Sequence, residues 1–413
     1  MLTCIRNIGL LLNPKPDGGW EELRQAAILF DHKIIRYGAE AEILSAAEVG
    51  NAEIIQANGR LVTPGLVDSH THPAFAEPRA AEFEMRNLGK SYQDIAAAGG
   101  GIRASVRSLR AISEDELVER MLPRLDRFLQ YGTTTLEAKS GYGLSTEQEL
   151  KQLRAIRHCN QEHPLDLVPT LLAAHEIPDE YRHDRAGYLD VVINETIPAV
   201  SQERLAEFCD VFCEEGVFTV DESRRVLEAG KTFGLIPKIH ADQLSSTGGA
   251  ELAAEVGAAS AEHLDYISDR GIEKIVEAGV VFTLLPGAVI FLGLNRYPPA
   301  RRILEKGGAL ALATDFNPGS SATQNLPLMM TLACVFCRLT VREALWAATR
   351  GGARALRRED QLGSLDPGYQ ADLVVWNCDD ENLIPYYFGM NLVADVFKAG
   401  RRVVSDGMVN SVS

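Results

Sequence analysis

LVTPGLVDSHTHP, residues 61–73, places His70 and His72 directly after a short apolar run. If this run forms a strand, the side chains of alternate residues point to the same face, so both imidazoles emerge on one side. Two neighbouring imidazoles can hold one metal ion, and nitrogen and oxygen ligands suit zinc or ferrous iron. A His-x-His pair alone is also found among ordinary surface and core histidines. The interpretation as a metal site therefore depends on further ligands elsewhere in the chain.

Apolar runs typical of strands recur through the middle of the chain, separated by longer amphipathic stretches. The eight runs are GLVDSHTHP, GTTTLEAKSG, LDLVPTLLAAH, CDVFCEEGVF, GLIPKIHADQ, AASAEHLD, VVFTLLPG and LALATDFNPG. One predicted helix, STEQELKQLRAIRHC (residues 145–159), opens with a Ser-x-x-Gln capping box. Alternating strands and helices indicate an α/β fold with a parallel sheet. Eight such units predict a (β/α)8 TIM-like barrel, whose active site lies at the carboxyl ends of the strands.

The two ends of the chain differ from this middle part. Residues 1–60 and 363–413 contain short strand-like segments separated by Gly and Pro turns. Short strands from both termini could pair in one sheet. We therefore predict a small β-sandwich-like accessory domain built from residues 1–60 and 363–413, and a barrel domain over residues 61–362.

Three later runs end in residues that can bind a metal ion. His240 ends the fifth run, His263 the sixth and Asp315 the eighth, so a barrel places them at the same mouth as His70 and His72. We predict that His70, His72, His240 and Asp315 bind one metal ion, with water or hydroxide completing the shell. Zinc can lower the pKa of such a water to roughly 7, which gives a nucleophile at neutral pH. Either His263 or Asp315 could take the water's proton, and the sequence leaves that choice open.

The composition excludes several classes of protein. Hydrophobic residues at 46% and charged residues at 24% are ordinary for a globular enzyme. A formal net charge of −16 repels phosphate backbones, and no basic stripe offsets it, so we expect no nucleic-acid partner. No apolar stretch reaches the ~20 residues of a membrane span, and we find no signal peptide. We therefore expect a cytoplasmic protein without a membrane partner.

The chain resembles the amidohydrolase superfamily and, within it, the imidazolonepropionase family. The wider resemblance covers essentially the whole chain and rests on PGLVDSHTHP, the ligands after the later strands and the closing GSLDPGYQADLVVW. The narrower one rests on EAKSGYGLS, LLAAHEIP, KIHADQLS, AEHLDY and ATDFNPGSS. It implies a small-molecule substrate, 4-imidazolone-5-propanoate of histidine degradation, whose cyclic amide is hydrolysed to N-formimidoyl-L-glutamate. Barrel enzymes of this superfamily commonly pair, which implies a homodimer.

The same resemblance implies roles for three residues outside the metal site. Arg79 would bind the propionate of the substrate, since a guanidinium can hold a carboxylate through two parallel hydrogen bonds. Tyr142, after the second strand, would contact the substrate. His175, at the end of the third run, would bind substrate as a catalytic residue through the imidazolone oxygen or nearby atoms. Without the family, solvated or packed side chains explain these positions equally well.

Four further residues complete the predicted substrate site. Asn317, Gly319 and Ser320 follow the eighth strand, where exposed backbone N–H groups and short polar side chains could hold a carboxylate, although a plain turn has the same composition. Gln243 stands where deaminases of the superfamily place a proton-shuttling Glu. An amide cannot transfer protons at neutral pH, but it can form hydrogen bonds with the imidazolone ring. The residue therefore argues against a deaminase.

The fourth run bears on the number of metal ions. It contains Glu214 and Glu215 but no lysine of the kind that binuclear relatives carboxylate to bridge two ions. We therefore predict one zinc or iron ion per subunit, with a glutamate bridge as the alternative. Two other functions remain open: a metal-dependent deaminase of a heterocyclic amine, and an inactive relative that serves as a scaffold.

Overall fold

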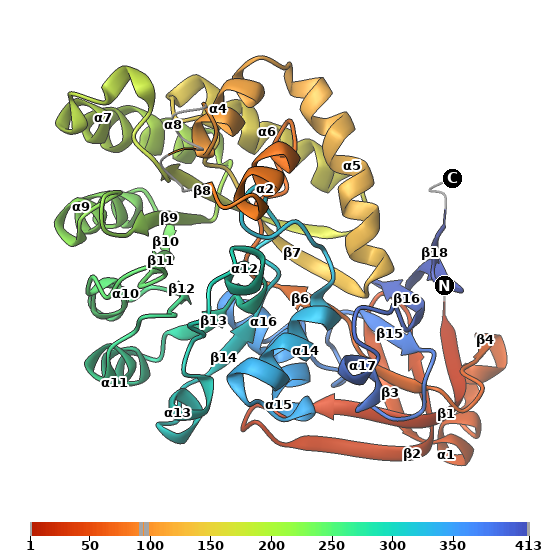
Figure 1. The fold of residues 1–413 in the computed structure, drawn as a ribbon. Helices are drawn as coiled ribbons and strands as arrows, with labels where there is room; N and C mark the ends of the chain where they lie inside the picture. Colours follow the sequence, from red (N-terminus) through yellow and green to blue (C-terminus); the bar gives the residue numbers. More distant parts are fainter. Residues whose placement is uncertain (1, 91–93, 95–98, 411–413) are drawn as a thin grey trace.

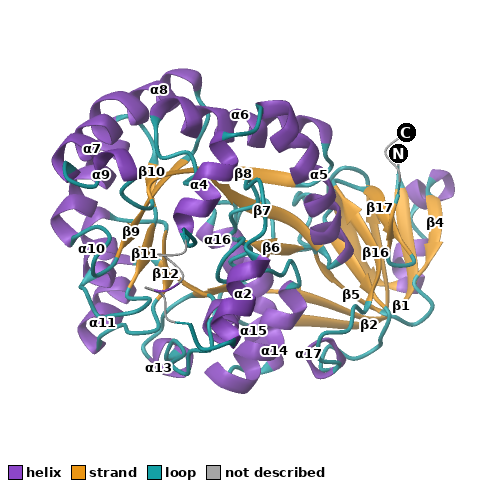
Figure 2. Cartoon of the chain, turned by 45° about the horizontal axis from the view of Figure 1, so that its top comes forward, coloured by secondary structure: helices purple, strands orange, loops and turns teal. Residues whose placement is uncertain are grey.

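The computed structural model describes residues 2–90, 94 and 99–410. Within these residues the chain forms two nine-stranded sheets, one in the middle of the chain and one built from both ends (Figure 1). Helices cover the outside of the first sheet, while the second lies beside it and contains the N-terminal strands next to the C-terminal ones (Figure 2). The predicted α/β fold is confirmed.

The middle sheet is a nearly closed barrel of parallel strands that follow one another in chain order. Its strands are β6 (Leu66–Asp68), β7 (Thr133–Lys139), β8 (Asp166–Ala174), β9 (Phe208–Cys213), β10 (Ile236–Pro237), β11 (Ile239–Ala241), β12 (Ser260–His263), β13 (Val281–Leu284) and β14 (Leu310–Leu312). Each of the eight predicted runs contains a strand, and the fifth run is divided into β10 and β11. The prediction of eight parallel barrel strands is therefore confirmed.

The barrel closes through the segments that follow its first and last strands. Thr71 and Phe316 form a parallel bridge just beyond β6 and β14. The backbone N–H of Asp315 donates to the carbonyl oxygen of His70 at 3.1 Å, and that of His72 donates to the carbonyl oxygen of Phe316 at 2.8 Å. The contacts that close the sheet therefore also bring His70, His72 and Asp315 together.

Two glycines allow a helix to pack directly on the strands beside this closure. They lie where the π-helix Ala347–Gly351 continues into α16 (Gly352–Ala355). A Cβ on Gly351 would lie 2.1 Å from the carbonyl oxygen of Leu310, and one on Gly352 would lie 2.2 Å from that of Val67. Any side chain at either position would push the helix off β6 and β14.

Helices follow most barrel strands and cover the outside of the barrel. They are α2 (Ala80–Asn87), α4 (Ile102–Arg110), α5 (Glu114–Gln130), α6 (Thr146–Glu162), α7 (Arg185–Val191), α8 (Ile197–Glu203), α9 (Val220–Thr232), α10 (Gly249–Val256), α11 (Asp269–Ala278), α12 (Pro286–Phe291), α13 (Ala300–Glu305), α14 (Leu326–Cys337) and α15 (Val341–Trp346). The short helix α17 (Leu383–Tyr386) lies between β15 and β16 in the chain and contacts α14. The helix predicted over residues 145–159 is confirmed as α6. Its predicted capping box is wrong, because the side chain of Ser145 accepts no hydrogen bond from the first turn. Among the described residues, none of the helices combines the length and the apolar character that a membrane span needs.

The second sheet joins strands from both ends of the chain. It contains β1 (Thr3–Pro14), β2 (Trp20–Phe30), β3 (Ile34–Ala39), β4 (Glu53–Gln56), β5 (Leu61–Pro64), β15 (Leu373–Trp376), β16 (Val393–Lys398), β17 (Arg401–Ser405) and β18 (Met408–Val409). The predicted pairing of strands from both termini is confirmed, and β5 is where they meet: it runs parallel to β1 and antiparallel to β15. The division of the chain at 60/61 and 362/363 stays a prediction. In the structure, the residues 61–64 lie in this second sheet, and the barrel begins with β6.

Candidate active site

Three predicted metal ligands meet where the barrel closes. The Nε2 atoms of His70 and His72 are 3.2 Å apart. The Oδ1 atom of Asp315 lies 3.4 Å from Nε2 of His70 and 3.5 Å from Nε2 of His72. Ligand atoms about 2.0–2.1 Å from one tetrahedral ion would be separated by about 3.4 Å. All three separations therefore match the geometry that a single zinc-sized ion requires.

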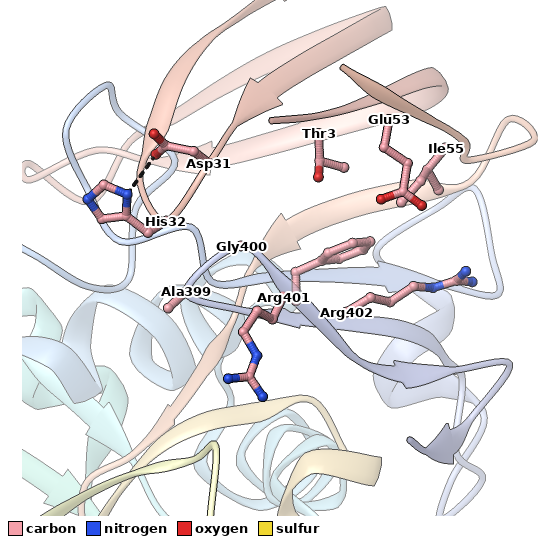
Figure 3. Close-up of a pocket in the computed structure, with 10 residues that line it drawn as sticks. Thr3, Asp31, His32, Glu53, Ile55, Ala399, Gly400, Arg401 and Arg402 are labelled. Atoms are coloured by element: carbon pink, nitrogen blue, oxygen red, sulfur yellow. Dashed lines mark ion pairs between the residues drawn. The ribbon is translucent and has the colours of Figure 1, made fainter. Parts of the chain in front are cut away.

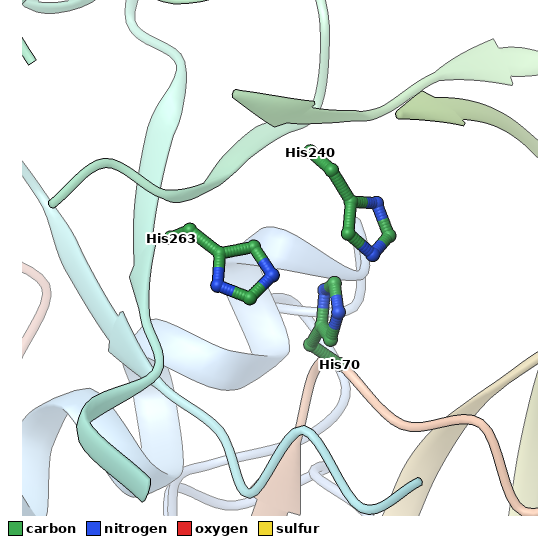
Figure 4. Close-up of side chains that lie close together, drawn as sticks. All are labelled: His70, His240 and His263. Atoms are coloured by element: carbon green, nitrogen blue, oxygen red, sulfur yellow. The ribbon is translucent and has the colours of Figure 1, made fainter. Parts of the chain in front are cut away.

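Two further histidines complete the cluster. His240 lies in β11, and His263 is the last residue of β12. Ring nitrogens of His70, His240 and His263 lie within 4.8 Å of one another, and Figure 4 shows the three rings converging. All of these side chains are buried. The structure thus brings together all five predicted residues in a buried metal-binding site, while the choice between His240 and His263 as ligand stays a prediction.

The charges around the site favour a cation. Burial acts to lower the pKa of His70, but the Glu262 and Asp315 carboxylates outweigh it and raise this pKa to about 9. Burial lowers the pKa of His72 to about 3, so its ring is neutral and able to bind a metal. Burial acts to raise the pKa of Asp315, but His70 and His72 hold it well below its ordinary value. A site that draws a proton onto His70 in this way suits a metal cation in its place.

The backbone at two of these residues is strained. Asp315 has φ of 52° and His263 has φ of 72°, both in the left-handed region that residues other than glycine seldom adopt. Such conformations cost about 1–3 kcal/mol each and are concentrated at functional sites. The positive φ turns the side chains of Asp315 and His263 away from the direction that a regular strand would give them. Such strain is typical of side chains with a functional role.

Tyr142 and His175 lie beside His72, one of the predicted metal ligands. Their rings are 5.6 Å apart, and the His175 ring stacks on His72 at 5.5 Å. Tyr142 is carried by a loop whose backbone is fully engaged: Glu149 of α6 accepts from the N–H groups of residues 141, 143 and 144, and Gln152 accepts from that of Tyr142. This inward role of α6 was not evident in the sequence, because Glu149 has the spacing of any first-turn acid.

Arg79 lies directly over the loop that follows Asp315. A Cβ on Gly319 would be 1.1 Å from Nη2 of Arg79, so only glycine allows the guanidinium to lie there. Arg86, about two turns farther along α2, donates to the carbonyl oxygen of Gly319 at 3.2 Å. Burial and the nearby Arg79 lower the pKa of Arg86. Two guanidinium groups therefore face this loop, which suits a carboxylate-bearing ligand.

The loop itself is organised by one amide. Oδ1 of Asn317 accepts from the backbone N–H groups of Gly319 and Ser320, both at 2.8 Å. Nδ2 of Asn317 donates to the carbonyl oxygen of Asp315 at 2.6 Å and to Oγ of Ser320 at 2.8 Å. In this structure the two N–H groups predicted to be exposed for a carboxylate are thus used within the loop. Binding of substrate by these three residues stays a prediction.

Replacing Gly319 with alanine is expected to raise KM with a much smaller effect on kcat. The added methyl group occupies the place of the Arg79 guanidinium and displaces it, while the metal ligands stay in position. Steady-state kinetics with the substrate that the family resemblance implies, and with an analogue that lacks its propionate, would measure this. The variant should no longer discriminate between the substrate and the analogue. An unchanged KM would contradict the carboxylate-binding role predicted for Arg79.

Gln243 is held by a carboxylate from the neighbouring strand. Glu214, after β9, accepts from the backbone N–H groups of Glu215 at 2.9 Å, Gln243 at 3.1 Å and Leu244 at 2.9 Å, and from the hydroxyl of Ser245. Its oxygen atoms are thus occupied by the loop. Among the described residues, no group with metal-ligand geometry includes Glu214, so the structure does not favour a glutamate bridge.

A set of charged side chains not predicted from the sequence lies behind the imidazoles of His70 and His240. It comprises Glu137, Lys139, Asp210, Lys238 and Glu262, none with any exposed surface. A signal was present: in the second and fifth strands, charged residues alternate with apolar ones, as inward-facing residues of a strand do.

A separate cavity of about 560 Å³ lies in the second sheet (Figure 3). Its wall includes Thr3, Glu53 and Arg401. His32 lines it too, but its side chain is 73% exposed and pairs with Asp31 at 3.1 Å. No predicted site residue lies here.

Comparisons with known proteins agree with this architecture. The model of the amidohydrolase family matches residues 61–409. The chain is 50% identical to the imidazolonepropionase of Geobacillus thermodenitrificans over 91% of this chain and 89% of that protein. It is 49% identical to that of Symbiobacterium thermophilum, covering 94% of both. It is 46% identical to that of Myxococcus xanthus over 96% of this chain and 92% of that protein.

Solved structures with the same fold are more distant in sequence. A zinc-bound adenosine deaminase from Xanthomonas campestris superposes with a TM-score of 0.71 at 18% identity, covering 100% of this chain and 94% of that one. The guanine deaminase of E. coli has a TM-score of 0.72 at 14% identity, covering 98% and 99%. These likenesses concern the fold.

Proposed function

The chain belongs to the amidohydrolase family and, within it, to the imidazolonepropionases, and we propose that it hydrolyses 4-imidazolone-5-propanoate to N-formimidoyl-L-glutamate. The observation that carries this proposal is the identity of about half of all residues over nearly the full length of the relatives. In the reaction, a water oxygen adds to the ring carbonyl carbon and the bond from that carbon to the ring nitrogen breaks. The carbon becomes a carboxylate, and the nitrogen takes up a proton.

We propose that His70, His72, His240 and Asp315 hold one zinc or iron ion per subunit. When bound there, the ion supplies Lewis acidity, which makes a water molecule acidic enough to attack at neutral pH. The matching separations of the three measured ligand atoms support this set. His240 directs Nδ1 to Asp210 at 2.9 Å, which leaves Nε2 for the centre.

Proton transfer is assigned to His263 and Asp315. Burial, reinforced by His240 and His70, keeps the pKa of His263 well below its ordinary value, so the ring is neutral and can accept a proton from the attacking water. Asp315 stays ionised and can orient that water with its second oxygen. The accepted proton is then available to the ring nitrogen that leaves the carbonyl carbon.

The other predicted residues would bind and orient the substrate. Arg79 provides the cation for the propionate, and Tyr142 lines the path from this cation to the metal ligands. His175 would bind the substrate through Nε2. Nδ1 of its ring lies 3.0 Å from the carbonyl oxygen of Gly141 and donates there, so Nε2 of the neutral ring accepts, from an N–H of the imidazolone ring or from a water beside its oxygen. Gln243 forms hydrogen bonds to the imidazolone ring.

The carboxylate end of the substrate is the proposed target of the loop after Asp315. Asn317 holds this loop in shape, while Gly319 leaves room for Arg79. The hydroxyl of Ser320 lies 3.4 Å from Oδ2 of Asp315, and Gly319, the preceding residue, lies against both guanidinium groups. Arg86 adds a second positive charge on the same side of the loop.

The reaction can be followed by the ultraviolet absorbance of freshly prepared 4-imidazolone-5-propanoate. We expect the chromophore to disappear with the purified protein, N-formimidoyl-L-glutamate to accumulate, and both to stop after chelator treatment until zinc or iron is restored. Metal content measured on the same sample should be near one ion per chain. A metal-loaded protein that leaves the substrate intact would contradict the proposal, and release of ammonia from a heterocyclic amine would identify a deaminase instead.

We further propose that the enzyme is a homodimer. Exposed apolar side chains gather on α14 and the segment that begins with α17, which contact each other through a hydrogen bond from Thr331 to Pro385. They are Val335, Phe336, Tyr386, Phe388 and Met390. Light scattering should give a mass near twice the 45.1 kDa of the chain, and a mass equal to that of one chain would contradict this.

A further inference from the structure

Five charged side chains fill the barrel beneath the metal ligands. Glu137 and Lys139 come from β7, Asp210 from β9, Lys238 from the link between β10 and β11, and Glu262 from β12. None has any exposed surface. Charges removed from water this completely are tolerated only when they are paired and hydrogen-bonded. The stability of the barrel interior therefore depends on their pairing. None of the five belongs to the proposed ligand set.

Two of the carboxylates face metal-ligating imidazoles. Oε2 of Glu262 lies 2.6 Å from Nδ1 of His70. Oδ2 of Asp210 lies 2.9 Å from Nδ1 of His240. A carboxylate at Nδ1 orients a ligating imidazole and leaves its Nε2 for the metal. These contacts set the direction of two rings from below the site.

One ammonium group holds both of those carboxylate oxygens. Nζ of Lys139 is 2.7 Å from Oδ2 of Asp210 and 3.1 Å from Oε2 of Glu262, the same two atoms that face the imidazoles. Lys238 pairs with the other oxygen of Glu262 at 2.9 Å and with Glu137 at 2.7 Å. Of the two lysines in this cluster, Lys139 therefore pairs with both imidazole-facing oxygens, and Lys238 with neither.

We infer that Lys139 is a positioning residue for the metal centre, acting on His70 and His240 through Glu262 and Asp210. This inference rests on the proposed metal site. With both lysines present, three carboxylates and two ammonium groups leave one net negative charge beneath a dication. Without Lys139, Oδ2 of Asp210 and Oε2 of Glu262 lose the ammonium group between them, while Lys238 still holds only the other oxygen of Glu262. The two imidazole-facing oxygens then repel each other and move, so the two imidazoles lose their common orientation. The second strand, which supplies no metal ligand, would in this way determine how tightly the ion is held.

The test compares Lys139→Met with Lys398→Met in the full-length protein. Lys398 is a matched control: it is also buried and paired with two carboxylates, Asp372 at 2.7 Å and Asp166 at 2.6 Å, but it belongs to the second sheet. Zinc affinity of the apoprotein would be measured by competition with a chromophoric chelator. The visible spectrum of the cobalt-substituted protein would report ligand geometry.

Both variants are expected to lose stability, but only Lys139→Met should weaken zinc binding, by about 10- to 100-fold, and change the cobalt spectrum. Equal zinc affinity and an unchanged cobalt spectrum in Lys139→Met would overturn the inference. If Lys139→Met does not fold, Glu262→Gln and Asp210→Asn decide the question. Each substitution keeps the size of the side chain and should weaken zinc binding by a similar factor. Wild-type zinc affinity in both variants would also overturn the inference. Turnover by the wild-type enzyme is measured separately, so failure of the proposed function is distinguishable from failure of this inference.

Discussion

Replacing His70 with alanine is expected to remove the metal ion and to lower kcat/KM by at least about 10³-fold. His70 is the centre of the ligand cluster: its Nε2 lies 3.2 Å from that of His72 and 3.4 Å from Oδ1 of Asp315, and its ring is 4.5 Å from that of His240. Lewis-acid activation contributes several kcal/mol to such a reaction, and each ~1.4 kcal/mol corresponds to tenfold in rate. Metal content and kcat/KM, measured on the same preparation, check both parts.

A suitable control is His158→Ala, which removes an imidazole from α6 whose side chain is 42% exposed. This variant should bind metal and turn over substrate like the wild type. A His70→Ala protein that still carries one ion per chain and keeps its activity would show that the metal site lies elsewhere.

Replacing His263 with asparagine is expected to lower kcat by about 10²- to 10⁴-fold while the metal stays bound. An amide cannot accept a proton at neutral pH, so the attacking water loses its base. Asparagine is the suitable substitute because residue 263 has φ of 72°, and asparagine tolerates the left-handed region better than most residues. The loss of rate therefore reports on chemistry rather than on backbone strain.

The outcomes of this substitution separate the roles left open for the cluster. Loss of metal together with activity would make His263 a ligand in place of His240. A kcat within tenfold of the wild type would instead assign the proton to Asp315. Measuring metal content alongside kcat distinguishes these results. Gln243→Glu is a useful companion variant because it places a titratable carboxyl group near the proposed position of the imidazolone ring and leaves the predicted metal ligands unchanged.

The strands and the main cluster could be predicted from the sequence because they follow from local patterns. Apolar runs of strand length recur eight times, and parallel strands bring their carboxyl ends to one side of a barrel. Residues that end runs far apart in the chain, such as His72, His240 and Asp315, therefore lie close together at one end of the barrel. The pairing of both termini was predictable for the same reason, since short strands need partners.

Other features depended on contacts between segments far apart in the chain. Lys139 meets Asp210 and Glu262 only because the closed barrel points three strands inward at one level. Glu149 lies in the first turn of α6, but its carboxylate accepts hydrogen bonds from the loop that carries Tyr142. The side-chain oxygen of Asn317 accepts from backbone N–H groups that we expected to be available to a ligand.

By itself, the sequence determined the type and order of the strands and the residues that stand at their ends, because hydrophobic periodicity and chain direction act between near neighbours. Only the tertiary structure decided which buried charges face each other, which backbone N–H groups remain available, and how the imidazoles are oriented. These features depend on the strand register and on the closure of the sheet between β6 and β14. There, ion pairs and hydrogen bonds between residues far apart in the chain outweigh the conformational preferences of each segment.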